Sequence, residues 1–372
     1  MKTRIFTTLC IAFLVFFGTI HCQRKQPVPT YLHSYATTFQ HDPHAANQQW
    51  FQEAKLGLFI HYGLYSLLGK GEWVQYADTI PYQTYSALQN QFTARDFDAE
   101  EIVTMAQAAG FKYITFTAKH HDGFCLFSTA QTAYNSILSP AKRDLVGELS
   151  EACDKHGMGL FLYYSYAADW HHPYFYPRSL WEKARPAYDP QPNEYLYQTA
   201  DDFRKYVDYV HAQLVELLTQ YKVAGIWFDP IKGFYANPSA FPIAETYALI
   251  RKHCPYALIS FKQGANGTED FMAPEHAQGA LVGGGYPIAA EIYELNKGKY
   301  KEVCTTMQYN RPGGKGSVWG YNAQAEHRNA EQVRRNIQAA MDGGYNLLLN
   351  VGPLPEGGIH PQDIKAFQDL SR

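Results

Sequence analysis

Polar and ionisable side chains follow the apolar stretches of this chain at five successive places. They are His61 and Tyr62, Lys119-His120-His121-Asp122, Tyr163-Tyr164-Ser165, Asp229, and Lys262-Gln263. Each apolar stretch has the length and composition of a buried strand. A charged or imidazole side chain at the end of a buried strand costs free energy unless that end is wet or contacts a ligand. Five such ends in succession favour a functional pocket over five separate structural polar residues.

Asp229 is the most informative of these residues. The run from Ile226 to Pro230 places a carboxylate at the tip of an otherwise apolar strand. Asp before Pro is also a common turn signal, so a structural role is the alternative. A carboxylate held between aromatic side chains suits a nucleophile. Cleavage of a glycosidic bond needs such a group and a second carboxyl that protonates the leaving oxygen.

The second carboxyl is left open among several acidic residues. Glu269, Asp270 and Glu275 lie within one stretch, and Glu291 and Glu302 follow further along the chain. A loop that follows a strand of a parallel barrel emerges on the same face as the other strand ends, so this stretch is the favoured source of the acid.

Short apolar runs alternate with longer amphipathic stretches from Leu56 onward. The strands are predicted at residues 56–63, 113–118, 158–164, 225–229, 257–261 and 345–351, and the helices at 98–110, 144–157, 203–221, 244–253, 331–341 and 361–370. Buried strands that alternate with helices predict a parallel sheet covered on both faces. The number of units favours a closed α/β barrel of the TIM type over an open doubly wound sheet, and no GxGxxG follows the first strand.

The composition excludes some classes of protein. A net charge of -3 offers no basic field for nucleic acid and no polybasic membrane patch. Aromatic residues form 15% of the chain, which suits either an aromatic core or a sugar pocket. Beyond residue 22, the cysteines have no CxxC spacing and are expected to be buried free thiols. They are Cys125, Cys153, Cys254 and Cys304.

The amino-terminal stretch predicts export. Lys2 and Arg4 precede an apolar run from Ile5 to Ile20, which is typical of a signal segment over residues 1–22 and of a periplasmic or extracellular protein. Membrane attachment is expected only if Cys22 is lipidated, for which His21 is an unfavourable neighbour. Residues 23–49 are expected to be an extension, and residues 50–372 the catalytic barrel.

Seven motifs resemble those of the α-L-fucosidase family of retaining glycoside hydrolases (glycoside hydrolase family 29), in the family's order. They are His61–Ser66, Glu72-Trp73, Thr117–Phe124, Tyr163–Ser165, Trp227–Asp229, Trp319–Asn322 and Asn346–Pro353. The resemblance runs from about Trp50 to Gly358, and Lys-His-His-Asp-Gly-Phe is its most specific motif. The chain departs from the family pattern in two places. Pro230 stands where the family often has Gly, and the predicted barrel is without the complete C-terminal β-sandwich that many members carry.

The resemblance implies a retaining exo-α-L-fucosidase that removes terminal α-L-fucose from fucosylated oligosaccharides or glycoconjugates, without a metal or cofactor. Asp229 matches the nucleophile, Glu275 the acid/base of some members, and Glu269 is the second choice. The residues matched to the sugar pocket are His61, Glu72, Trp73, His120, His121 and Tyr164, and Trp227 can cover the sugar's methyl group or ring face.

Two other classes compete with this interpretation. His61, His120, His121 and Asp122 could ligate zinc in a metal-dependent hydrolase. Adjacent residues of a strand point to opposite faces, which argues against that set unless the chain has left the strand. A sugar-binding protein that has lost its acid is the non-enzymatic alternative, and the presence of Asp229 with several candidate acids argues against it.

Overall fold

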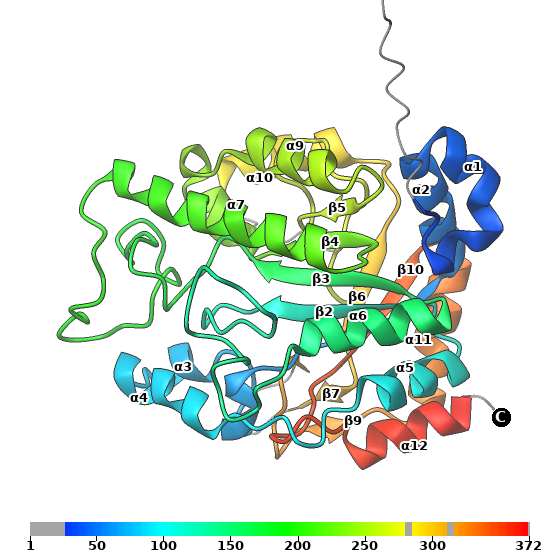
Figure 1. Ribbon diagram of the computed structural model, residues 1–372, viewed down its shortest axis with the longest axis horizontal. Coiled ribbons are helices and arrows are strands. Elements are labelled where there is room, and N and C mark those ends of the chain that lie inside the picture. The colour runs from blue at the N-terminus through cyan, green and yellow to red at the C-terminus, as the bar shows by residue number, and fades with distance from the viewer. Residues whose placement is uncertain (1–26, 280–284, 311–315, 371–372) are drawn as a thin grey trace, which may run out of the picture.

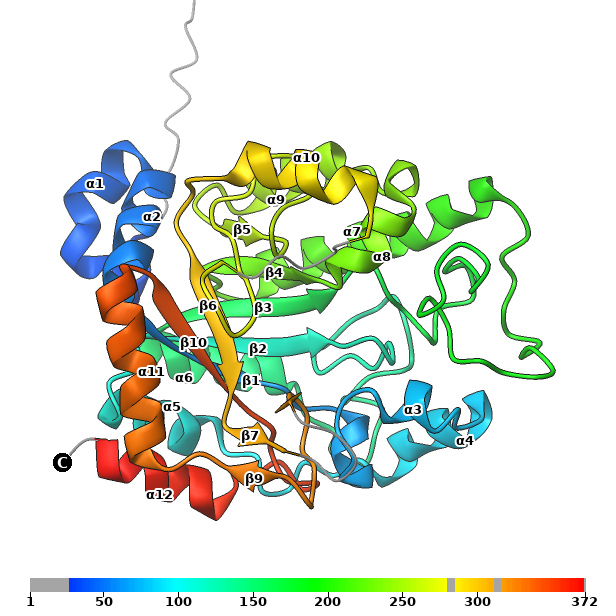
Figure 2. The ribbon, with the colours of Figure 1, turned by 180° about the vertical axis from the view of Figure 1, so that it is seen from behind.

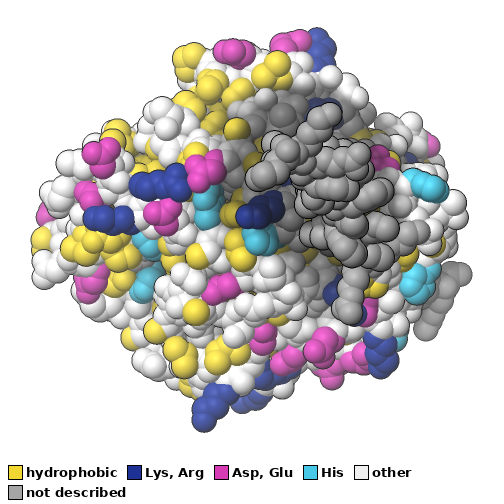
Figure 3. Space-filling view, turned by 45° about the horizontal axis from the view of Figure 1, so that its top comes forward, with side chains coloured by type: hydrophobic (Ala, Val, Ile, Leu, Met, Phe, Trp, Pro, Cys, Tyr) yellow, Lys and Arg dark blue, Asp and Glu magenta, His cyan; other side chains and the backbone are white. Residues whose placement is uncertain are grey.

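The computed structural model describes residues 27–279, 285–310 and 316–370. The predicted export signal and Cys22 lie outside these residues. Within the described ranges, no helix combines the length and apolarity needed to cross a membrane. Acidic and basic side chains are interspersed on the face shown in Figure 3.

Seven parallel strands form one curled sheet with the order β5-β4-β3-β2-β1-β10-β6 (Figures 1 and 2). The strands are β1 (Leu56–Ile60), β2 (Tyr113–Lys119), β3 (Gly159–Ser165), β4 (Gly225–Asp229), β5 (Leu258–Ser260), β6 (Glu302–Thr306) and β10 (Asn346–Val351). Nearly every residue of these strands is buried, as expected for a parallel sheet covered on both faces.

Residues 270–276 bridge the gap between the two edge strands. On one side, the amide of Asp270 donates a hydrogen bond of 2.8 Å to the carbonyl of Ile259 in β5. On the other, the amide of Cys304 in β6 donates 3.1 Å to the carbonyl of Pro274. The predicted TIM-like (β/α) architecture is therefore confirmed, with an irregular segment in place of a regular strand between β5 and β6.

Amphipathic helices form the outer layer of the sheet. They are α5 (Ala99–Ala108), α6 (Leu145–His156), α7 (Phe203–Gln220), α9 (Ile243–His253), α10 (Pro287–Asn296), α11 (Ala330–Gly343) and α12 (Pro361–Leu370). Side chains of Asp98, Asp144 and Asn329 cap the first turns of α5, α6 and α11, so local sequence fixes where these helices begin. The predicted helices agree with these bounds to within a few residues.

Helix α2 (Pro43–Ala54), preceded by η1 (Thr30–Tyr35) and α1 (Ala36–His41), covers the amino ends of the strands. Trp50 packs against Tyr113 and Phe161, with ring centroids 6.1 and 6.4 Å away. Figure 1 shows α1 and α2 at the opposite end of the sheet from α3 (Val74–Ala77) and α4 (Tyr82–Ser86). The boundary predicted at residue 50 therefore falls inside a helix that packs on the barrel.

The remaining short elements connect the strands at the carboxyl end of the sheet. They are η2 (Leu64–Leu68), η3 (Ala87–Gln91), η4 (Ala200–Asp202), α8 (Ile231–Ala236) and η5 (Pro238–Ala240), with β7 (Gln308–Tyr309), β8 (Ser317–Val318) and β9 (Glu326–His327) in a small antiparallel sheet. The sequence did not predict β6 or α10. In β6, the polar residues Glu302, Thr305 and Thr306 interrupt the apolar run that would indicate a buried strand. The four cysteines are free and buried, as predicted.

Candidate active site

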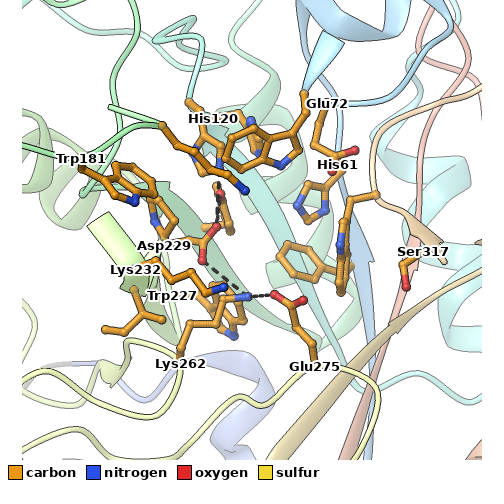
Figure 4. A pocket seen from close by; sticks show the side chains of 18 residues that line it. His61, Glu72, His120, Trp181, Trp227, Asp229, Lys232, Lys262, Glu275 and Ser317 are labelled. Carbon is orange, nitrogen blue, oxygen red and sulfur yellow. Dashed lines mark hydrogen bonds and ion pairs between the residues drawn. The ribbon is translucent and has the colours of Figure 1, made fainter. Parts of the chain in front are cut away.

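One pocket, with a volume of about 360 Å³, opens at the carboxyl ends of the strands (Figure 4). Its lining residues are Phe59, His61, Glu72, Trp73, His120, His121, Tyr163, Trp181, Lys183, Trp227, Asp229, Pro230, Ile231, Lys232, Lys262, Glu275, Ser317 and Trp319. β1 to β4 each contribute a side chain at or near their carboxyl ends, where active sites of TIM-type barrels lie.

Asp229 is the last residue of β4, and its side chain is 15% exposed in this pocket. The Tyr163 hydroxyl donates a hydrogen bond of 2.9 Å to Oδ2, and the Lys262 ammonium lies 3.5 Å from Oδ1. Burial raises the pKa of Asp229 above its ordinary value, and the positive charge of Lys262 opposes that rise. The carboxylate is therefore held in place from two sides while one part of it faces the cavity.

Lys262 contacts a second carboxylate, that of Glu275. Burial alone would raise the pKa of Glu275, but the charge and hydrogen bond of Lys262, together with His276 and His61, lower it below its ordinary value. The same balance keeps the lysine charged, since burial would lower the pKa of Lys262 and both carboxylates raise it. Figure 4 shows the ammonium between Asp229 and Glu275.

Of the five acidic candidates for the second carboxyl, Glu275 alone lines the pocket. Glu269 is 2% exposed, and its carboxylate accepts hydrogen bonds from Tyr247 and from backbone amides of its own loop. Asp270 pairs with Arg251 at 2.6 Å. Glu291 is exposed on α10, and Glu302 is buried inside the sheet. Glu269, the second choice for the acid, therefore does not line the pocket, and its carboxylate holds its own loop.

One ring nitrogen of His61 is hydrogen-bonded within the protein, and the other is left for the pocket. Its Nδ1 lies 2.6 Å from Oδ1 of Asn350, whose amide group donates to the Trp319 carbonyl. The amide oxygen therefore accepts the Nδ1 proton, which leaves Nε2 of His61 as an acceptor. Burial lowers the pKa of His61 to about 3, so its imidazole is neutral at ordinary pH.

His120 and His121 both line the pocket, because β2 ends at Lys119 and the chain has left the strand. The rule that adjacent strand residues point to opposite faces therefore does not apply to this pair, and their ring centroids lie 4.0 Å apart. Burial lowers the pKa of each well below its ordinary value. No described residue offers a hydrogen-bond partner to Nδ1 of His120, so this buried nitrogen is available to a ligand hydroxyl.

His121 is oriented toward Asp229 by a hydrogen-bonded serine. The Ser165 hydroxyl donates to the Ala168 carbonyl at 2.6 Å, so it accepts the Nδ1 proton of His121 at 2.7 Å. The opposite nitrogen, Nε2, lies 3.7 Å from the Asp229 carboxylate. That distance is too long for a hydrogen bond, and a hydroxyl group of a ligand could contact both.

Aromatic rings form the walls of the pocket. The Trp73 ring contacts His121 edge to face at 4.9 Å, and Glu72 accepts a hydrogen bond of 2.8 Å from the Gly320 amide. Trp227 and Trp319 line the same cavity. A wall of this kind offers flat apolar surface beside hydrogen-bonding groups.

Tyr164 does not line the pocket. Its hydroxyl donates to Gln213 at 2.6 Å on the outer side of the sheet, while Tyr163 faces the cavity. Successive residues of a strand alternate between faces. The prediction named Tyr164, which is the neighbour of the tyrosine that faces the pocket and therefore points to the other side of the sheet. Neither Lys262 nor Asn350 was predicted as a site residue, although Lys262 follows a predicted strand and Asn350 lies in the last of the seven motifs.

In the described part of the chain, no three His, Cys, Asp or Glu side chains are placed to hold a metal ion together. The zinc set suggested for this pocket is therefore not assembled by the described side chains. Asp122 does not line the pocket and instead accepts a hydrogen bond of 2.9 Å from Tyr85.

The fold and the pocket define a TIM-like (β/α) protein with carboxylates, neutral imidazoles and indole rings at the carboxyl ends of its strands. Residues 23–372 match the family model described as Alpha-L-fucosidase. The chain therefore belongs to the alpha-L-fucosidase family, as its motifs had indicated.

Curated relatives include the tissue alpha-L-fucosidase of Rattus norvegicus, which is 30% identical over 341 residues, covering 84% of this chain and 65% of the relative. The plasma alpha-L-fucosidase of the same species is 26% identical over 343 residues, covering 83% of this chain and 65% of the relative. The chain thus spans just under two thirds of the length of these relatives.

Solved structures of bacterial alpha-L-fucosidases share the fold. Isoenzyme 1 from Paenibacillus thiaminolyticus has a TM-score of 0.70 and 32% identity, over 87% of this chain and 74% of that protein. An enzyme from Lactobacillus casei in complex with alpha-L-fucose product has a TM-score of 0.70 and 29% identity, over 87% of this chain and 97% of that protein.

Proposed function

We propose that this protein is a retaining exo-α-L-fucosidase that hydrolyses terminal α-L-fucose from fucosylated glycans. The proposal rests above all on one observation: the carboxylates of Asp229 and Glu275 both contact the Lys262 ammonium in one pocket. Family membership supports it, as does the similar Lactobacillus casei structure, which holds alpha-L-fucose.

In the proposed mechanism, Asp229 attacks the anomeric carbon while Glu275 gives its proton to the departing glycosidic oxygen. Glu275 then takes a proton from water, which attacks the same carbon and releases Asp229. The Glu275 contact with Lys262 is shorter than the 3.5 Å contact with Asp229, so the contacting oxygens lie within about 7 Å of each other. This upper bound supports a retaining mechanism, in which the two carboxyl groups lie roughly 5–5.5 Å apart.

The first step needs Glu275 protonated and Asp229 ionised. Without substrate, Lys262 favours the ionised form of both groups. We expect a bound fucoside to separate the ammonium from Glu275, after which burial raises the pKa of that carboxyl. The lysine would remain beside Asp229 and keep the nucleophile charged.

Neutral imidazoles suit an uncharged sugar. His61, His120 and His121 can accept or donate hydrogen bonds to hydroxyl groups without a charge that would need a counter-ion. Trp73 and Trp227 offer flat surfaces for the ring and its methyl group. The signal-like residues 1–22 support export as part of the same proposal.

The proposal is tested by turnover of p-nitrophenyl α-L-fucoside by the full chain, with and without a chelator. Asp229→Asn should lower kcat by roughly a thousandfold or more, whereas Glu291→Gln, a control on the exposed face of α10, should not change it. NMR of the first product should show the α-anomer. Activity that a chelator abolishes, or Asp229→Asn with near-normal turnover, would contradict the proposal.

A further inference from the structure

A buried carboxyl that this mechanism does not use lies beneath the pocket. Glu302 is the first residue of β6, and it is 1% exposed. Tyr113 donates a hydrogen bond of 2.7 Å to Oε1, and the Trp227 indole donates 3.0 Å to Oε2. β6 pairs with β10 and not with β2 or β4, from which these two donors come. The Glu302 side chain therefore reaches across the interior of the curled sheet.

Trp227 connects this carboxyl to the reacting groups. The Lys262 ammonium lies 4.5 Å from the centre of the indole ring, and the Tyr163 ring stacks on it with centroids 5.6 Å apart. Tyr163 in turn donates to Asp229. An indole nitrogen can only donate a hydrogen bond, so its acceptor Glu302 fixes how the ring is rotated about its side-chain bonds.

Both hydrogen bonds to Glu302 come from neutral donors. Burial raises the pKa of Glu302 to about 7, which those two bonds only partly oppose. Among the residues that the structure describes, Tyr113 on β2 and Cys304 on β6 are titratable groups that interact with it. Burial raises the pKa of each well above its ordinary value, so both remain uncharged over the working range of pH.

We propose that Glu302 is a positioning residue of the active site, which holds the Trp227 indole where it supports Lys262 and forms the floor of the sugar pocket. The inference rests on the proposed function for its kinetic consequence. Its structural consequence, the control of the indole hydrogen bond, can be measured without any turnover.

The kinetic test compares two replacements of Glu302. Glu302→Leu removes the acceptor and should lower kcat/KM for a fucoside by about tenfold to a hundredfold, as expected for a misplaced pocket wall. Glu302→Gln should restore most of the loss, because its amide oxygen can accept from Trp227 while its amide nitrogen donates to the Tyr113 oxygen. Tyr113→Phe leaves the indole contact in place, and should stay within about threefold of the wild type.

The structural test follows the Trp227 indole signal in a ¹H–¹⁵N spectrum of the full chain, assigned by its loss in Trp227→Phe. In the wild type this signal should move with pH about a midpoint of about 7, and in Glu302→Gln it should not move. A titration that persists in Glu302→Gln, or a folded Glu302→Leu protein with wild-type kcat/KM, would overturn the inference. A wild type inactive on every fucoside would refute the proposed function, and the spectrum would still decide the role of Glu302.

Discussion

Lys262 gives the pocket its charge balance at the scale of single residues. Its ammonium lies between Asp229 and Glu275, so two negative charges that would repel each other share one positive charge. A positive charge at this distance favours the ionised form of both carboxyls. The lysine therefore influences the pH range in which one carboxyl is charged and the other carries a proton.

Replacing Lys262 by Met should shift both limbs of the pH profile of kcat/KM to higher pH. Without the ammonium, the pKa of Asp229 rises, so the nucleophile ionises later, and the pKa of Glu275 rises, so the acid keeps its proton longer. Lys232→Met is the matched control, since Lys232 lines the pocket but is exposed. A Lys262→Met profile that keeps both limbs in place would mean that the lysine does not set either pKa.

The assignment of the acid can be separated from loss of the nucleophile. Glu275→Ala should hydrolyse p-nitrophenyl fucoside well and should lose about 10²- to 10⁴-fold on a fucosylated oligosaccharide, because only the second leaving group needs a proton. Azide should restore turnover by taking the space of the missing carboxylate. If azide rescues Glu269→Ala but not Glu275→Ala, the roles given to the two residues are reversed.

The segment after β5 illustrates how one element positions the site. Residues 270–276 run between β5 and β6, and this path brings Glu275 to the mouth of the sheet. The turn before it is held by Glu269, whose carboxylate accepts from the amides of Ala265, Asn266 and Gly267. A buried acceptor with several backbone donors is costly to remove.

Glu269→Ala should therefore lower the free energy of unfolding by about 3 kcal/mol, since three amides and the Tyr247 hydroxyl lose their acceptor in a buried loop. Urea denaturation measures the change. Glu291→Ala, at an exposed position, should change stability by no more than about 0.5 kcal/mol. Equal stability of Glu269→Ala and wild type would show that the loop does not depend on this carboxylate.

In the whole molecule, the two ends of the sheet have different environments. The amino ends of the strands are covered by α2, and the carboxyl ends form the pocket. Trp50 packs at the covered end, against the rings of Tyr31 and Phe161. Trp50 does not line the pocket, so a substitution there can change substrate binding only through the packing of the core.

Trp50→Ala should destabilise the protein by about 3–5 kcal/mol, because it opens a cavity in an aromatic cluster. The folded fraction should keep the KM and kcat of the wild type at 25 °C, because the pocket lies at the other end of the sheet. Thermal unfolding and kinetics on the same preparation test this pair of expectations. A large change in KM would show that the two ends are coupled.

The sequence by itself determined the family, the alternation of strands and helices, and the residues that stand at strand ends. Asp229, His61, His120 and His121 were identifiable because strand ends are marked by where an apolar run stops, which is a local property. The amphipathic helices were predictable for the same reason, since their spacing and caps are written within a few residues of each other.

Only the tertiary structure decided which polar residues face the pocket. Glu269 and Glu275 belong to one stretch, and the path of the backbone buries one and brings the other to Lys262. Tyr163 and Tyr164 are chemically alike, and only the pairing of β3 with β4 sets which ring faces Asp229. These outcomes depend on contacts between segments far apart in the chain, and hydrophobic spacing along one segment does not encode the face on which its neighbour lies.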